Sequence, residues 1–171
     1  MIAILITLCL LIIFFYIAIL VGKTSDENKI FEVFGETKEM IYYKKQRCEL
    51  LASGICFGYK YYVLNLGIHP TAYVEIPQDN KNYKKNYDDI DILVHGGLTY
   101  SGKCLSFENQ TLEGWFIGWD YAHYGDYSGA LAYLGKDNGK KWTTKEILVD
   151  VFSVCEQLTI QEKGKQNELR K

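Results

Sequence analysis

A regular series of polar residues follows an aromatic, strand-like stretch in GWFIGWDYAHYGDYSG, residues 114–129. Asp120, His123 and Asp126 stand three residues apart. A neutral imidazole with two carboxylates is a ligand set for zinc, manganese or iron, and a carboxylate bonded to imidazole also orients a general base. The spacing therefore predicts a site that is catalytic or binds a divalent metal through Asp120, His123 and Asp126. Turn formation by Asp120 and by the Gly125–Asp126 pair is the structural alternative.

His95 is the second candidate for chemistry, because two glycines follow it. The run IDILVH at residues 90–95 predicts a strand that ends at this histidine. Gly96 and Gly97 remove side chains beside it, so that backbone amides can approach a ligand or the chain can turn sharply. A hydrogen-bonded histidine beside a β-bulge is the structural alternative. The residues expected to contact a ligand are Gly96, Gly97, Thr99, Tyr100 and Trp119.

Other side chains offer a nucleophile or a stacking surface. Cys104 lies nine residues after the second candidate histidine, flanked by Ser101 and Ser106, so a Cys–His or Ser–His nucleophile is a further alternative. None of these residues stands in a G-x-S-x-G context, which weakens that interpretation. Trp115 and Trp119 fall on one face of a predicted strand, where they form part of the core or a stacking wall for a planar ligand.

The elements that must position these residues are mostly strands. CFGYKYYVLN at residues 56–65 and TAYVEIP at residues 71–77 predict a hairpin, and we interpret His69 in the loop between them as a turn residue. The segments 90–95 and 111–120 are predicted as further strands, separated from the hairpin and from each other by glycine-rich or polar turns.

Two helices are expected outside the membrane. The segment ETKEMIYYKKQRCELL at residues 36–51 favours a short amphipathic helix. Thr143 and Glu146 have the spacing of a capping box, and an apolar stripe at helical spacing then predicts a helix over residues 144–160. We therefore expect an α+β fold, in which a twisted, mostly antiparallel sheet of four or five strands carries this C-terminal helix on one face.

The segments HGGLTYSG at residues 95–102 and WFIGWDYAHYGD at residues 115–126 resemble a group of short, uncharacterised proteins of bacteriophages and bacteria. Those proteins carry an H-G-G-L-T-Y segment and a second segment that contains D-x-A-H-x-G-D. The likeness covers residues 54–158 and implies no activity, but two separated polar motifs that occur together imply one pocket built from both. The expected catalytic residues are His95, Asp120, His123 and Asp126.

The first segment of the chain is apolar. Residues 2–22 contain no charge and are long enough to cross the ~30 Å hydrocarbon core of a bilayer as a helix. A cleaved signal peptide is the alternative, but no positive charge precedes the run and no small-residue cleavage site follows it. Lys23, Lys29 and Lys38 lie after the span and none before it, so we expect a single-pass anchor with the rest of the chain in the cytoplasm. The bacteriophage and bacterial group does not require such an anchor.

The rest of the chain divides into a linker at residues 23–40, an α+β domain at residues 41–160 and a flexible tail at residues 161–171. The formal net charge of −2, with no basic face, argues against a nucleic-acid partner. Without a C-x-x-C pair, we interpret the cysteines of the domain as reduced thiols, with disulfides as the alternative if the topology is inverted. These cysteines are Cys48, Cys56, Cys104 and Cys155.

Three functions remain open from sequence. The first is a membrane-anchored accessory protein of bacteriophage type, attached to the lipid bilayer through residues 2–22, whose domain binds a small ligand or a divalent metal. The second is a metal-dependent hydrolase, in which the same residues activate water. The third is a membrane-tethered interaction module without a pocket, whose protein partner the sequence does not name.

Overall fold

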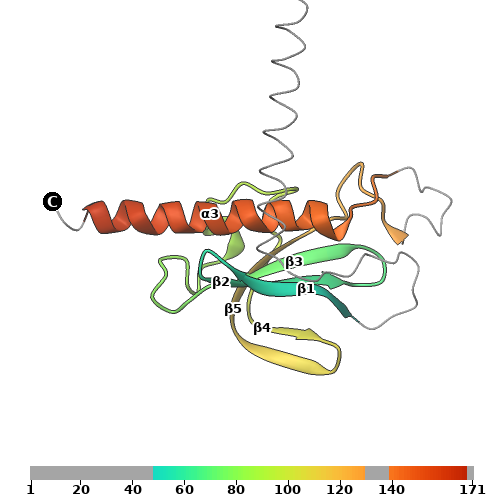
Figure 1. Cartoon of the computed structure of the whole chain (residues 1–171), viewed down its shortest axis with the longest axis horizontal. Coiled ribbons are helices and arrows are strands. Elements are labelled where there is room, and N and C mark those ends of the chain that lie inside the picture. The colour runs from blue at the N-terminus through green and yellow to red at the C-terminus, as the bar shows by residue number, and fades with distance from the viewer. Residues whose placement is uncertain (1–47, 130–138, 169–171) are drawn as a thin grey trace, which may run out of the picture. The chain divides into compact units, whose positions relative to one another are not determined.

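A computed structural model describes residues 48–129 and 139–168 of the chain (Figure 1). The predicted anchor at 2–22, the linker at 23–40 and most of the predicted helix at 36–51 lie outside these residues. Among the described residues, no helix is both long and apolar enough to cross a membrane. Their elements, in order, are β1 (Glu49–Cys56), β2 (Tyr59–Asn65), β3 (Pro70–Glu75), the 3-10 helix η1 (Tyr87–Asp89), β4 (Tyr100–Phe107), β5 (Gln110–Asp120) and α3 (Thr144–Glu168).

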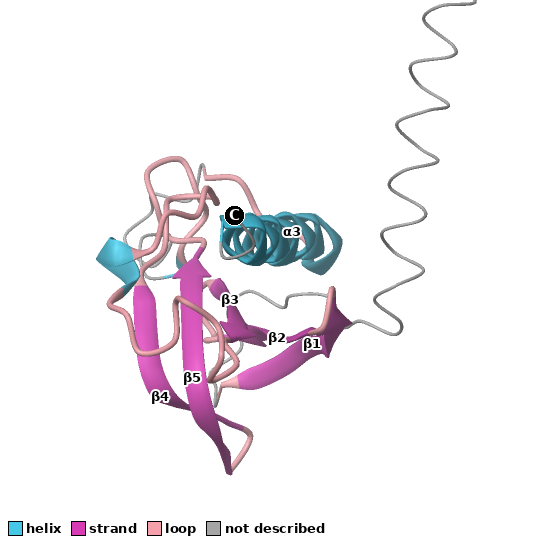
Figure 2. Ribbon diagram, turned by 90° about the vertical axis from the view of Figure 1, so that its left-hand side faces the viewer, coloured by secondary structure: helices cyan, strands magenta, loops and turns pink. Residues whose placement is uncertain are grey.

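The described strands form one antiparallel sheet in the order β1-β2-β3-β5-β4, with α3 packed against β1, β2 and β3 (Figure 2). The predicted α+β class, with an antiparallel sheet and a C-terminal helix on it, is therefore confirmed. β5 lies between β3 and β4, and its pairing with β3 places Thr71 beside Asp120. This register brings the loop before β3 next to the residues that follow β5.

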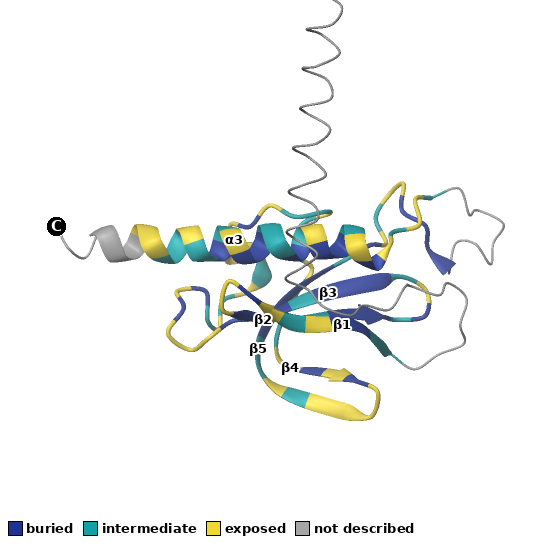
Figure 3. Ribbon diagram, in the orientation of Figure 1, coloured by how far each residue is buried: buried dark blue, intermediate teal, exposed yellow. Residues whose placement is uncertain are grey.

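Both faces of the sheet are packed, and successive residues of a strand point to opposite faces and so to different hydrophobic cores. On β5, Ile117 and Trp119 are fully buried on the face that α3 covers, and the side of α3 toward the sheet is buried as well (Figure 3). Phe116 points to the other face, where it packs with Leu64 and Leu105.

The second core is closed by the sheet itself. The turn between β4 and β5 returns to the start of β1, where the backbone N–H of Glu108 donates to Cys48 at 3.0 Å. The carboxylate of Glu108 in turn accepts from the N–H of Leu50 at 3.0 Å. These contacts cover polar backbone groups of an edge strand that would otherwise be open for pairing with another chain.

The prediction of a strand at residues 90–95 was wrong. This segment forms no strand and pairs with none of the described strands, and its backbone is held by side chains of α3. Gln157 accepts from the N–H of Leu93 at 2.8 Å and donates to the carbonyl of the same residue at 2.7 Å. Gln161 donates to the carbonyl of Asp91 at 2.6 Å. The glutamine amides thus supply the donors and acceptors that a neighbouring strand would have supplied.

Two boundaries in the first half of the domain also differ from prediction. Residues 49–51, assigned from sequence to a helix, begin strand β1. The predicted strand at 56–65 contains a two-residue turn at Phe57 and Gly58, whose φ angles are +50° and +87°. Positive φ at both central residues is typical of the tight hairpin turn whose twist matches that of the strands, and it joins β1 to β2.

The C-terminal helix begins as predicted. The hydroxyl of Thr143 accepts from the N–H of Glu146 at 3.3 Å, and the carboxylate of Glu146 accepts from the N–H of Thr143 at 2.9 Å. This is the reciprocal pattern of a capping box. The helix continues to Glu168, eight residues beyond its predicted end at residue 160.

Candidate functional site

Three of the predicted site residues converge at the end of β5. The ligand atoms of His95, His123 and Asp126 lie within 4.8 Å of one another, and we call these residues the histidine cluster. His95 comes from the turn before β4, while His123 and Asp126 come from the turn after β5. Predicted from two separate motifs, these residues therefore do lie in one place.

Asp126 is the centre of the cluster, with a side chain that is only 4% exposed. Its Oδ2 accepts from Nε2 of His95 at 2.7 Å and from the backbone N–H of His123 at 3.0 Å. Its Oδ1 accepts from the indole N–H of Trp142 at 2.7 Å. Burial acts to raise the pKa of Asp126, but these hydrogen bonds outweigh it and the pKa is lowered. The carboxylate is therefore ionised and held by donors on both oxygens.

His95 is fixed by aromatic rings as well as by its hydrogen bond. Its ring stacks on Tyr121 with centroids 5.2 Å apart and an angle of 6° between the planes. The rings of Trp142 and His123 contact it at 4.6 Å and 5.5 Å. An imidazole oriented in this way, with Nε2 on a carboxylate, has Nδ1 left for a substrate, an ion or solvent.

The ring nitrogen Nδ1 of His123 lies near two carboxylates but forms a hydrogen bond with neither. Its Nδ1 lies 3.8 Å from Oδ1 of Asp120 and 3.8 Å from Oδ2 of Asp126, too far for hydrogen bonds. This nitrogen is buried and has no hydrogen-bond partner among the residues that the structure describes. Because buried polar atoms are almost always paired, an imidazole nitrogen that faces two carboxylates invites a cation or a proton.

Gly96 makes room for His123. The backbone at Gly96 has φ +65°, and a Cβ there would overlap the imidazole ring of His123. Gly97 has φ +82° but open space where its Cβ would be. Gly96 is therefore required by the close approach of His123, whereas Gly97 is favoured only by its backbone conformation.

Asp120 combines the two roles that the sequence left open. Its Oδ2 accepts from the hydroxyl of Thr99 at 2.9 Å, and its Oδ1 accepts from the N–H of Ala122 at 3.1 Å, which is the chemistry of a turn. The same Oδ1 faces Nδ1 of His123. Asp120 therefore lies beside the histidine cluster, in contact with one of its members.

Two predicted ligand-binding residues lie apart from the cluster. Tyr100 donates its hydroxyl to the carbonyl of Cys104 at 2.6 Å and packs its ring on Tyr73. Trp119 is 1% exposed and donates its indole N–H to the hydroxyl of Tyr121 at 2.9 Å. Trp119 therefore reaches the cluster only through Tyr121, whose ring supports His95.

Residues that sequence reasoning missed complete the surroundings. Tyr121 and Trp142 hold His95, and the Tyr121 hydroxyl donates to Asp150 on α3 at 2.7 Å. His69, interpreted from sequence as a turn residue, lies close enough to Asp120 and His123 for their charges to act on it. Burial lowers the pKa of His69 by more than the nearby carboxylate of Asp120 raises it, and His123 lowers it a little further. All three histidines of the chain thus gather at one end of the sheet.

Asp150 gives a test of this arrangement through pH. Burial raises the pKa of Asp150 despite the hydrogen bond from Tyr121. A raised folded-state pKa contributes stability that is present below the unfolded value of about 3.9 and is lost as pH rises through the folded value. Asp150→Asn keeps an oxygen acceptor and stays neutral, so we expect its stability relative to wild type to improve from about pH 4 to about pH 7.

Urea denaturation of both proteins at the two pH values measures this difference. Glu156→Gln, which removes a carboxylate from an exposed position on the same helix, is the matched control and should show a much smaller pH effect. A variant Asp150→Asn that loses stability relative to wild type as pH rises would contradict the assignment.

Comparison of the chain with protein-family models, with curated proteins and with solved structures gave no match.

Proposed function

We propose that the domain binds a divalent transition-metal ion in the histidine cluster and, through that ion, a small polar ligand. The observation that carries this proposal is the buried Nδ1 of His123, which has no hydrogen-bond partner within residues 48–129 and 139–168 and lies 3.8 Å from each of two carboxylate oxygens. Imidazole and carboxylate together favour zinc, manganese or iron over calcium and magnesium.

The distances support one ion shared by the cluster. Ligands of one zinc ion, each about 2.0–2.2 Å from it, lie roughly 3–4 Å apart, and the separation of 3.8 Å between His123 and Asp126 falls in this range. The 2.7 Å between His95 and Asp126 fits a shared proton, which an ion would replace after a small opening. Trp142 and the backbone of His123 would keep Asp126 oriented, as outer hydrogen bonds do in metal sites.

A metal-dependent hydrolase is the second candidate, favoured by the three ligands that the histidine cluster offers. Three protein ligands leave a coordination position for water, and a bound divalent ion lowers the pKa of such a water toward about 7. The hydrolase differs from the binding protein only in the use of that water, so both share the metal site.

The test is a measurement of bound metal in the full chain, purified in detergent without chelators and supplied with zinc or manganese. We expect about one equivalent in wild type, and its loss in His123→Ala and in His95→Ala, with circular dichroism to establish folding. Asp79→Asn, on an exposed loop away from the cluster, should keep the metal. Wild-type protein that is folded and holds no more metal than either histidine variant would refute the proposal.

The place of the protein in the cell is proposed from sequence. Residues 2–22 are proposed as a single-pass anchor, and the lysines that follow favour a cytoplasmic domain. The resemblance of residues 54–158 to bacteriophage and bacterial proteins supports an accessory role of bacteriophage type. A chain that resists carbonate extraction would support the anchor. A domain that external protease reaches only after the membrane is permeabilised would support the cytoplasmic placement.

A further inference from the structure

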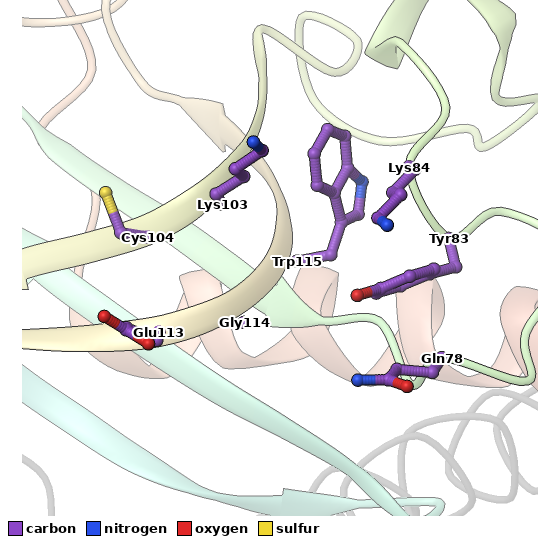
Figure 4. Close-up of a pocket in the computed structure, with 8 residues that line it drawn as sticks. All are labelled: Gln78, Tyr83, Lys84, Lys103, Cys104, Glu113, Gly114 and Trp115. Carbon is purple, nitrogen blue, oxygen red and sulfur yellow. The ribbon is translucent and has the colours of Figure 1, made fainter.

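A second concave site lies on β4 and β5, away from the histidine cluster. A cavity of about 550 Å³ opens there, in the size range of sites for small molecules. Tyr83, Lys84, Lys103 and Trp115 line it together with Gln78 and Glu113 (Figure 4). Trp115 precedes Asp120 by five residues on β5, which at roughly 3.3 Å per residue separates the two sites by about 17 Å.

A β-bulge shapes this cavity. Gly102 pairs with Phe116, and Cys104 pairs with Glu113, so that two residues of β5 stand opposite Lys103 alone. One of these two is Trp115. Bulges of this kind redirect side chains and occur next to binding sites. On the facing loop, Lys84 has φ +62° at the end of the turn over residues 81–84.

The polar groups of the cavity are incompletely paired. The indole N–H of Trp115 is buried and has no hydrogen-bond partner in the described part of the chain. Neither Lys84 nor Lys103 forms an ion pair with any other residue that the structure describes, and Lys84 instead lies over the ring of Tyr83 at 5.2 Å. Tyr83 and Trp115 meet edge to face with centroids 6.3 Å apart. In Figure 4, Trp115 stands between the two lysines.

We propose that this cavity binds a nucleoside monophosphate. Tyr83 and Trp115 offer aromatic surface for a base, and the two lysines offer positive charge for a phosphate. Gln78 and Glu113 supply the donor and acceptors that base edges and ribose hydroxyls require. A mononucleotide fits better than a nucleic-acid strand, because the chain has a net charge of −2 and a strand would need a basic stripe beyond the cavity.

The test is calorimetric titration of the full chain in detergent with AMP, GMP, CMP and UMP, beside inorganic phosphate and a single-stranded oligonucleotide. We expect at least one mononucleotide to bind more tightly than phosphate and than the oligonucleotide per site. The double variant Lys84→Gln/Lys103→Gln should weaken that affinity by about tenfold or more, through loss of the charge-assisted contacts. Lys163→Gln, the same change on α3, should leave it within about twofold.

Two further measurements test mononucleotide binding without depending on the folding of the lysine variant or on the metal site. The exposed thiol of Cys104 lines the cavity, so a bound mononucleotide should slow its alkylation by iodoacetamide in wild type. His123→Ala should bind the mononucleotide as wild type does, because it lies at the other site. Failure of every mononucleotide to bind, equal binding of phosphate alone, or tighter binding of the oligonucleotide would each overturn the proposal.

Discussion

Asp126→Asn should lower the free energy of unfolding by about 3 kcal/mol and remove metal from the histidine cluster. The carboxylate accepts from His95, from the backbone of His123 and from Trp142, and its side chain is nearly inaccessible to water. An amide has a single acceptor oxygen, so its NH₂ group must face at least one of these donors. Buried donors left without an acceptor account for the expected loss.

The pH dependence of this variant has a definite sign. Because the pKa of Asp126 is lowered in the folded protein, its ionised form contributes stability above the unfolded pKa of about 3.9. That contribution is lost as pH falls through the folded-state pKa. The gap between wild type and Asp126→Asn should therefore be largest near neutral pH and shrink in acid, as urea denaturation at about pH 7 and about pH 3 would measure.

Asp120→Asn is the matched control for this substitution. Asp120 accepts two hydrogen bonds and is more exposed, so an amide there should cost only about 1 kcal/mol. Metal content is then compared in those preparations whose circular dichroism matches wild type. An Asp120 variant that is destabilised more than the Asp126 variant would show that the centre of the cluster has been assigned wrongly.

Short-range patterns predicted much of this fold. The capping box at Thr143 and Glu146 joins residues three apart, and strand 111–120 shows its alternation within ten residues, so both are visible without knowledge of the rest of the chain. The segment 90–95 shows the limit of this reasoning. Its apolar run has the composition of a strand, but its hydrogen bonds go to Gln157, more than sixty residues later.

The candidate site was predictable only to the extent that its residues lie in two short motifs. Asp120, His123 and Asp126 share one turn, and their convergence followed from spacing. The aromatic walls of the site come from residues without a pattern of their own, since Trp142 is sixteen residues from its partner Asp126. His69 could have been found from the hairpin, because antiparallel pairing of β3 with β5 places Thr71 opposite Asp120.

Gly96 and Gly97 permit the sharpest test of how the cluster is built. Both have positive φ, so alanine at either position should cost about 1–2 kcal/mol in backbone strain. Only at Gly96 would the added methyl group also overlap the ring of His123. Overpacking adds roughly 1–3 kcal/mol when neighbours cannot move, so Gly96→Ala should lose about 3 kcal/mol in total. Thermal or urea denaturation of the two variants measures this difference.

The two glycine variants should also differ in their affinity for the metal ion. If the ring of His123 moves away from the methyl group at position 96, its Nδ1 leaves the two carboxylates, and Gly96→Ala should bind the ion at least tenfold more weakly. Gly97→Ala has no such neighbour and should keep wild-type metal affinity despite its strain. Equal loss of metal in both variants would mean that the turn conformation, rather than contact of Gly96 with His123, holds the cluster together.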